Sequence, residues 1–213
     1  MSSCRFLVRF YLICQKQMKV LSLYCTVWTV RRDKMKTQDK ILDAAAVLIL
    51  EEGVSNVTLE KIAKRAEISK GGLLYHYGTK EALFQELNVA ALREFDEAIV
   101  QYLNKQPNGR GAYARAYALA TIEDIQKGGT HRSSALISIF SDHPEIMAIW
   151  KEGYARWQEQ FDQDGLDWEE AATIRYVCDG LWFNEMAGTT STSAIAADLL
   201  HNLLARIDKG EGD

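Results

Sequence analysis

The segment that decides the fold is Thr58–Phe84, TLEKIAKRAEISKGGLLYHYGTKEALF. Thr58 is a favourable N-cap for a helix that runs to Ala66, and Ser69 is a favourable N-cap for a second helix that ends near Tyr77. The apolar residues that pack these two helices together are Leu59, Ile62, Ala63, Ile68 and Leu73 or Leu74. Two short helices joined by a tight turn are typical of a helix-turn-helix, whose second helix enters the major groove of DNA.

The second helix carries two adjacent glycines, Gly71 and Gly72, each of which costs about 1 kcal/mol relative to alanine. Their missing side chains let the helix backbone lie close to the floor of a groove, which a purely structural helix does not need. Lys70, Lys80 and the helix N-terminus offer positive charge to phosphates. The residues predicted to contact DNA are Thr58, Ser69, Lys70, Gly71, Gly72, Leu73, Tyr75, His76, Tyr77 and Lys80.

Some of these positions also have a structural interpretation. Tyr77 is as well suited to packing under the preceding helix as to touching DNA, and Thr58 is expected to serve both as a cap and as a phosphate donor. Lys64 and Arg65 are equally consistent with a solvated surface. The whole segment could be a basic face of a helical bundle, but such a bundle would not require the two glycines or the short helix pair.

From about Ile41 to Leu87 the chain resembles the N-terminal DNA-binding domain of TetR-family repressors. The resemblance implies a homodimer that binds a pseudo-palindromic operator in double-stranded DNA until a small apolar effector releases it. The chain departs from the family pattern at Gly78, where a larger residue is common, and at Glu67, where the family usually has a left-handed glycine. We expect Glu67 to keep the left-handed conformation and to carry local strain, since a Cβ disfavours it.

The chain from Thr37 onward is predicted to be all-α, because its apolar residues recur with a helical period and no run alternates as a half-buried strand does. Thr79 is expected to cap a long helix, and capping boxes that begin at Asp142 and Asp167 are expected to open later ones. The predicted domains are an atypical, unstructured extension at 1–34, a three-helix helix-turn-helix domain at 35–82, and a helical effector-binding and dimerisation domain at 83–213.

Residues 1–34 differ in composition from everything that follows. They carry a net charge of +6, and because the whole chain has a net charge of −4, the remainder carries −10. Any DNA contact must therefore come from a local patch. The apolar run Val20–Val30 is shorter than the ~20 residues of a membrane span, and Arg31-Arg32 follows it where a signal peptide would have its cleavage site. We expect translation to begin at Met35 and residues 1–34 to be dispensable.

The C-terminal half is rich in aromatic residues, which are consistent both with core packing and with an apolar cavity. The residues predicted to border a ligand site are Phe140, Trp150, Trp157 and Trp182, with Arg175 or Asn184 as candidate polar anchors. The family layout implies that the final two helices, about Trp168–Ala187 and Ile195–Arg206, form the homodimer interface. The apolar stripe from Ile195 to Ile207 would otherwise be exposed at the end of the chain.

No catalytic, metal or cofactor site is predicted. Residues 141–143, Ser-Asp-His, are consecutive and cannot face one another as a triad, and His131 lies too far from His143 for a helical metal pair. The acidic run 162–167 has Gly165 at the fourth position instead of the sixth, which favours a polar turn over a calcium loop. The cysteine spacing fits a reducing cytoplasm. The alternative to a DNA-binding regulator is a helical small-molecule binding protein that does not bind DNA.

Overall fold

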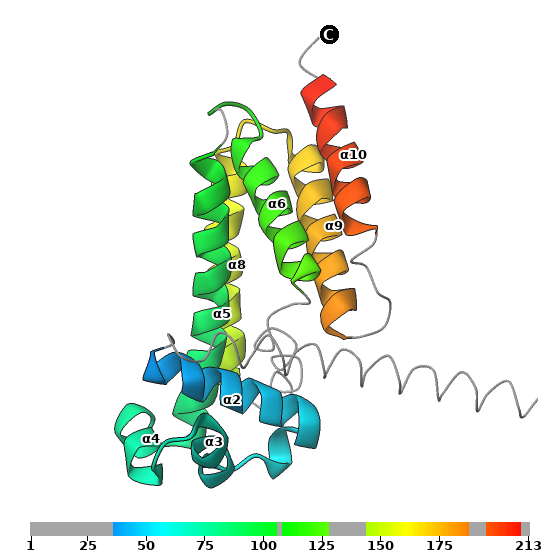
Figure 1. The fold of residues 1–213 in the computed structure, drawn as a ribbon. Coiled ribbons are helices and arrows are strands. Elements are labelled where there is room, and N and C mark those ends of the chain that lie inside the picture. Colours follow the sequence, from blue (N-terminus) through cyan, green and yellow to red (C-terminus); the bar gives the residue numbers. More distant parts are fainter. Residues whose placement is uncertain (1–35, 106–107, 128–143, 188–194, 210–213) are drawn as a thin grey trace, which may run out of the picture. The chain divides into compact units, whose positions relative to one another are not determined.

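The computed structural model describes residues 36–105, 108–127, 144–187 and 195–209, and all regular elements in these ranges are helices (Figure 1). They are α2 (Thr37–Glu52), the short 3-10 helix η2 (Val54–Asn56), α3 (Leu59–Ala66), α4 (Lys70–His76), α5 (Lys80–Leu103), α6 (Ala112–Gln126), α8 (Pro144–Asp162), α9 (Trp168–Met186) and α10 (Ala196–Lys209). The all-α prediction is confirmed. The chain divides into two units between Lys40 and Ile41, and the contacts described below lie within the unit that begins at Ile41.

The predicted helix-turn-helix is present as α3 and α4, and its core is apolar. Ile41 on α2, Ile62 on α3 and Leu73 on α4 are fully buried. The three predicted caps, Thr58, Ser69 and Thr79, each accept a hydrogen bond from the backbone N–H three residues on, at 3.3, 3.0 and 3.1 Å. These caps fix where α3, α4 and α5 begin, because they satisfy N–H groups that have no partner within the helix.

The turn between α3 and α4 is made by a left-handed residue, as predicted. Glu67 has φ 58° and ψ 43°, and it is the one residue other than glycine with a positive φ in the described ranges. Its backbone N–H donates to the carbonyl oxygens of Ala63 and Lys64, which closes the end of α3. The tight turn is therefore formed with a side chain at a position that favours glycine.

The C-terminal helices share an aromatic core. Helix α5 packs against α6 and α8, α6 packs against α9, and α10 packs against both α9 and α6. Tyr117 of α6 lies at the centre of the core, with its ring centroid 5.1 Å from that of Phe95 and 5.2 Å from that of Phe161. The predicted capping box of Asp167 and Glu170 opens α9. The box predicted at Asp142 lies outside the described residues.

Helices α5 and α8 run parallel along a seam of regularly spaced contacts. In order along both helices these contacts join Asn88 to Trp150, Leu92 to Gly153 and Asp96 to Trp157. The two indole N–H groups donate to Asn88 Oδ1 at 2.7 Å and to Asp96 Oδ1 at 2.6 Å. Between these two hydrogen bonds the helices approach each other closely. A Cβ added at Gly153 would lie only 3.0 Å from Leu92 Cδ2. The seam is thus held at both ends by hydrogen bonds and in the middle by close packing.

Candidate nucleic-acid interface

Helix α4 presents an open face. A Cβ added at Gly71 would meet no heavy atom of the described residues within 4 Å, so packing within that part of the chain does not require glycine there. The Tyr75 side chain on the same short helix is 87% exposed, far more than a tyrosine that helps to form the core. An exposed tyrosine beside a glycine that packing does not explain is what a helix lying against a nucleic acid needs.

The second glycine has a structural reason of its own. A Cβ at Gly72 would lie 3.2 Å from the Ser69 Oγ, the atom that accepts the Gly72 N–H and caps α4. A side chain at Gly72 would therefore press on the cap, whereas one at Gly71 would not. Gly71 is the position where the absence of a side chain points to a partner outside the chain.

The hydroxyl groups of Thr58 and Ser69, which cap α3 and α4, can still donate a hydrogen bond to DNA. Thr58 and Ser69 are exposed, and each uses its hydroxyl oxygen to accept a backbone N–H at the start of a helix. A hydroxyl that accepts in this way still has its own hydrogen to donate, and phosphate oxygens accept such bonds. Both residues combine capping with a geometry that suits phosphate contact.

Two of the residues predicted to contact DNA point into the protein. Leu73 is fully buried as the core residue of α4, so its side chain does not face outward as a DNA contact would, while its neighbour Leu74 is exposed. Tyr77 is buried in the same core, so its ring packs within the protein and does not face DNA. The next aromatic residue, His76, is partly exposed and stacks edge-on with Tyr75, with ring centroids 5.5 Å apart.

Most cations of the helix-turn-helix already have a partner within the protein. The pairs are Lys61 with Glu52 (2.6 Å), Arg65 with Glu51 (2.5 Å) and Lys70 with Glu60 (2.5 Å). Lys80 donates its ammonium hydrogen to the carbonyl oxygen of Val54 at 2.7 Å, so it fixes the loop after α2 instead of standing free for a phosphate. Within the described ranges, Lys64 is exposed and has no ion pair.

The tryptophans predicted to border a ligand are packed together. Trp150 and Trp157 on α8 are buried and hydrogen-bonded to α5, and Trp182 on α9 donates its indole N–H to Asp124 Oδ2 at 2.8 Å. The rings of Trp150 and Trp182 contact each other at a tilt of 43°, with centroids 5.6 Å apart. Phe140, the fourth predicted residue, lies outside the described residues. The three that are described act as core and as polar links between helices.

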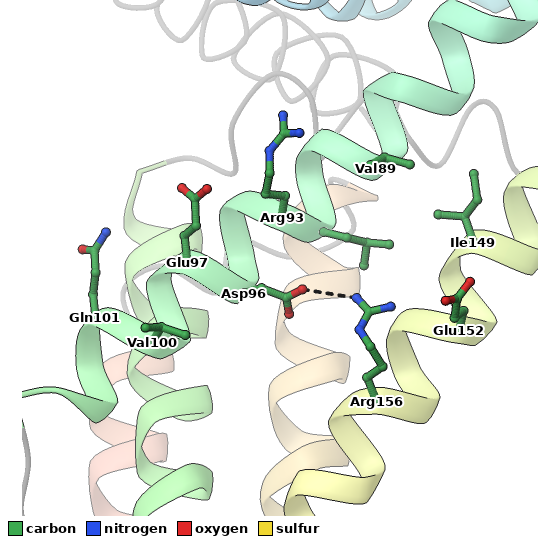
Figure 2. Close-up of a pocket in the computed structure, with 10 residues that line it drawn as sticks. Val89, Arg93, Asp96, Glu97, Val100, Gln101, Ile149, Glu152 and Arg156 are labelled. Carbon is green, nitrogen blue, oxygen red and sulfur yellow. Dashed lines mark hydrogen bonds and ion pairs between the residues drawn. The ribbon is translucent and has the colours of Figure 1, made fainter.

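Open volume lies instead on the outside of the α5–α8 seam. A groove of about 730 Å³ lies between the two helices, and Asp96 and Arg156, which line it, form an ion pair with an N to O distance of 3.2 Å. Figure 2 shows the side chains that line this groove. Its apolar lining is Val89, Leu92, Val100 and Ile149, and its polar lining is Arg93, Asp96, Glu97, Gln101, Glu152 and Arg156. None of the predicted tryptophans lines this groove. Sequence patterns do not reveal it because it arises from the pairing of two helices distant in the chain.

A polar cluster is enclosed by the aromatic core. The Tyr117 hydroxyl donates to Asp179 Oδ1 at 2.8 Å, and burial raises the pKa of this carboxyl above its usual range, although the tyrosine bond lowers it. Arg175, one of the two predicted polar anchors, lies 5.1 Å above the Tyr154 ring and 3.9 Å from Asp179. The other, Asn184, donates its amide to the Gly180 carbonyl at 2.7 Å. The cluster joins α6, α8 and α9.

The acidic turn between α8 and α9 is a helix cap. The Asp164 carboxylate accepts the backbone N–H groups of Tyr113 and Ala114 at 2.7 and 2.8 Å, so it stabilises the start of α6. This confirms the predicted polar turn. In the described part of the chain no three His, Cys, Asp or Glu residues gather as metal ligands, and no helix there is long and apolar enough to cross a membrane.

Comparisons with known proteins agree with this geometry. Residues 41–87 match the model of bacterial regulatory proteins of the tetR family, and residues 111–208 match that of the tetracyclin repressor-like C-terminal domain. The transcriptional regulator UidR of Escherichia coli K12 is 22% identical over 84% of this chain and 85% of its own length.

The regulator AcrR of Shigella flexneri is 28% identical over 44% of this chain, and the chain spans less than half, 43%, of AcrR. The structure of AibR in complex with isovaleryl coenzyme A and operator DNA superposes with a TM-score of 0.51 at 18% identity, over 74% of this chain and 97% of AibR. The N-terminal and C-terminal matches name the same family and follow one another along the chain. The chain therefore belongs to the tetR family of bacterial regulatory proteins.

Proposed function

We propose that this chain is a ligand-responsive transcriptional repressor that binds a pseudo-palindromic operator as a homodimer. The observation that carries the proposal is the open face of α4, where Gly71 has no structural reason to be glycine and Tyr75 is almost fully exposed. Capped N-termini of α3 and α4 supply N–H groups and hydroxyls suited to phosphates. The relative AibR was crystallised with operator DNA and an acyl coenzyme A, which supports both parts of the proposal.

The proposed dimer interface is the outer face of α9 and α10. Trp168, Tyr176 and Phe183 are spaced eight and seven residues apart, which keeps them on one side of α9, and all three are more than half exposed. Ile195 and Leu199 add exposed apolar surface at the start of α10, while Leu200 and Leu204 turn inward to the core. An exposed apolar surface of this kind marks an interface, and two helices per subunit suit a four-helix contact.

The α5–α8 seam is the proposed route from effector to DNA. Helix α5 follows α4 after a three-residue link, and along the seam it is joined to α8 by Asn88–Trp150 and Asp96–Trp157. A ligand in the groove of Figure 2 would touch both helices and the Asp96–Arg156 pair. Such a ligand releases the operator if it prefers the arrangement in which the two α4 helices of a dimer no longer match the half-sites.

A mobility-shift assay with the DNA that flanks the gene tests this function. We expect retention of one flanking fragment that excess scrambled duplex does not compete away. Gly71→Leu should lose that retention while keeping its helical circular dichroism spectrum. A protein that binds small molecules but retains no fragment would support the alternative, a helical binding protein without DNA binding.

A further inference from the structure

Glu60 lies at the point where the two DNA-facing helices meet. It occupies the first turn of α3, and its carboxylate accepts a hydrogen bond from the Lys70 ammonium at 2.5 Å. Both side chains are exposed, 69% for Glu60 and 55% for Lys70. The hydrogen bond and charge of Lys70 lower the pKa of Glu60, so the carboxylate is ionised at neutral pH.

The other two ion pairs of the helix-turn-helix differ in place. Lys61 and Arg65 pair with Glu52 and Glu51 at the end of α2, so these contacts hold α3 to α2. The Glu60–Lys70 pair instead joins the first turns of α3 and α4. In a helix-turn-helix these helix N-termini meet the DNA backbone, where a carboxylate opposes the phosphates and an ammonium attracts them.

We propose that Glu60 limits the affinity of this protein for DNA of any sequence, because its carboxylate binds the Lys70 ammonium in place of a DNA phosphate. The proposal rests on the function proposed above. In the free protein the carboxylate stands in for a phosphate oxygen, and as long as the pair stays closed on DNA, Lys70 neutralises no phosphate. Glu60 also stabilises the N-terminus of α3, because a negative charge in the first turn is favourable there.

The salt dependence of binding gives the size of the effect. A neutralised pair presents no net charge to DNA, whereas Lys70 released from Glu60 neutralises one phosphate in each subunit. Each such phosphate adds ~0.9 to the slope of log affinity against log salt, which is about 1.8 for a dimer. The affinity gain of Glu60→Gln should therefore be about tenfold larger at about 50 mM salt than at about 200 mM.

The test measures fluorescence anisotropy of labelled operator and scrambled duplexes with the full-length chain. Glu60→Gln is expected to bind both duplexes more tightly by the same factor, because a phosphate contact does not read the bases. Glu52→Gln is the matched control, since it removes an exposed carboxylate from a lysine pair of similar length on a helix that does not enter the groove. If log affinity falls with log salt at the same slope for Glu60→Gln and for the parent, the proposal is overturned.

A second comparison separates direct competition from the general effect of a negative charge. In a Lys70→Ala background, Glu60→Gln should improve affinity less than it does in the parent, because no ammonium remains to be released. An equal improvement in both backgrounds would contradict competition for Lys70. If the parent itself discriminates no operator from scrambled DNA, the proposed function fails; if it does and Glu60→Gln changes nothing, only this inference fails.

Discussion

Replacing Glu67 by glycine should stabilise the protein, although glycine is usually a destabilising substitution. Glu67 has φ 58° and ψ 43°, a conformation that costs a residue with a Cβ roughly 1–2 kcal/mol. The greater freedom of glycine in the unfolded chain cancels about 0.4–1 kcal/mol of the gain. The net increase in the free energy of unfolding should be about 0.5–1 kcal/mol, which raises Tm by about 1–4 °C in a chain of this size.

Thermal unfolding of Glu67→Gly beside Glu67→Gln isolates the strain. Both variants remove the charge, but only glycine removes the Cβ, and Glu67→Asn should lie between them because asparagine tolerates this conformation. Both Gly and Gln variants should also bind operator more tightly at low salt, since each removes a negative charge from the helix-turn-helix. A Gly variant that is no more stable than the Gln variant would refute the strain argument.

Three further substitutions test other parts of the structure. Gly71→Ala should raise the free energy of unfolding by about 0.5–1 kcal/mol, because the added Cβ meets no described atom. The same substitution should weaken operator binding in an anisotropy titration. Tighter binding would mean that α4 does not lie in the groove. Gly153→Ala should lower the free energy of unfolding by about 1–3 kcal/mol in urea, because its Cβ would press on Leu92; an unchanged midpoint would show that the seam adjusts freely. Burial raises the pKa of Asp179 in the folded protein, so ionisation of this carboxyl lowers the free energy of unfolding as pH rises. Tyr117→Phe removes a hydrogen bond that favours the ionised carboxylate. The stability lost in Tyr117→Phe should therefore grow as pH rises through the pKa of Asp179, and a pH-independent loss would contradict this.

Features set by neighbouring residues could be predicted from the sequence. Thr58, Ser69 and Thr79 cap their helices because a hydroxyl reaches an N–H three residues on whatever surrounds it. The capping box at Asp167 follows the same rule. The left-handed conformation of Glu67 could be expected only from the resemblance to the TetR family, which usually has a left-handed glycine at this position.

Features set by the packing of distant residues could not be predicted in this way. Leu73 and Leu74 are adjacent and chemically alike, and only the position of α2 and α3 decides that Leu73 faces inward. The partner of Lys80 is the carbonyl oxygen of Val54, which lies 26 residues earlier in the chain and has no side-chain signature. The tryptophans of α8 and α9 find acceptors about sixty residues away, so a pattern of aromatic residues could not distinguish core from cavity.

The proposal that α4 reads an operator is tested most directly by incubating the full-length chain with fragments of its own genome and sequencing those it retains. We predict enrichment of a pseudo-palindrome, with half-sites whose centres lie one DNA turn or a multiple of it apart, as two α4 helices of a dimer require. Gly71→Leu, carried through the same selection, should enrich nothing. Retention of unrelated fragments by the parent chain, or the same enriched site with Gly71→Leu, would contradict the proposal that α4 reads the operator.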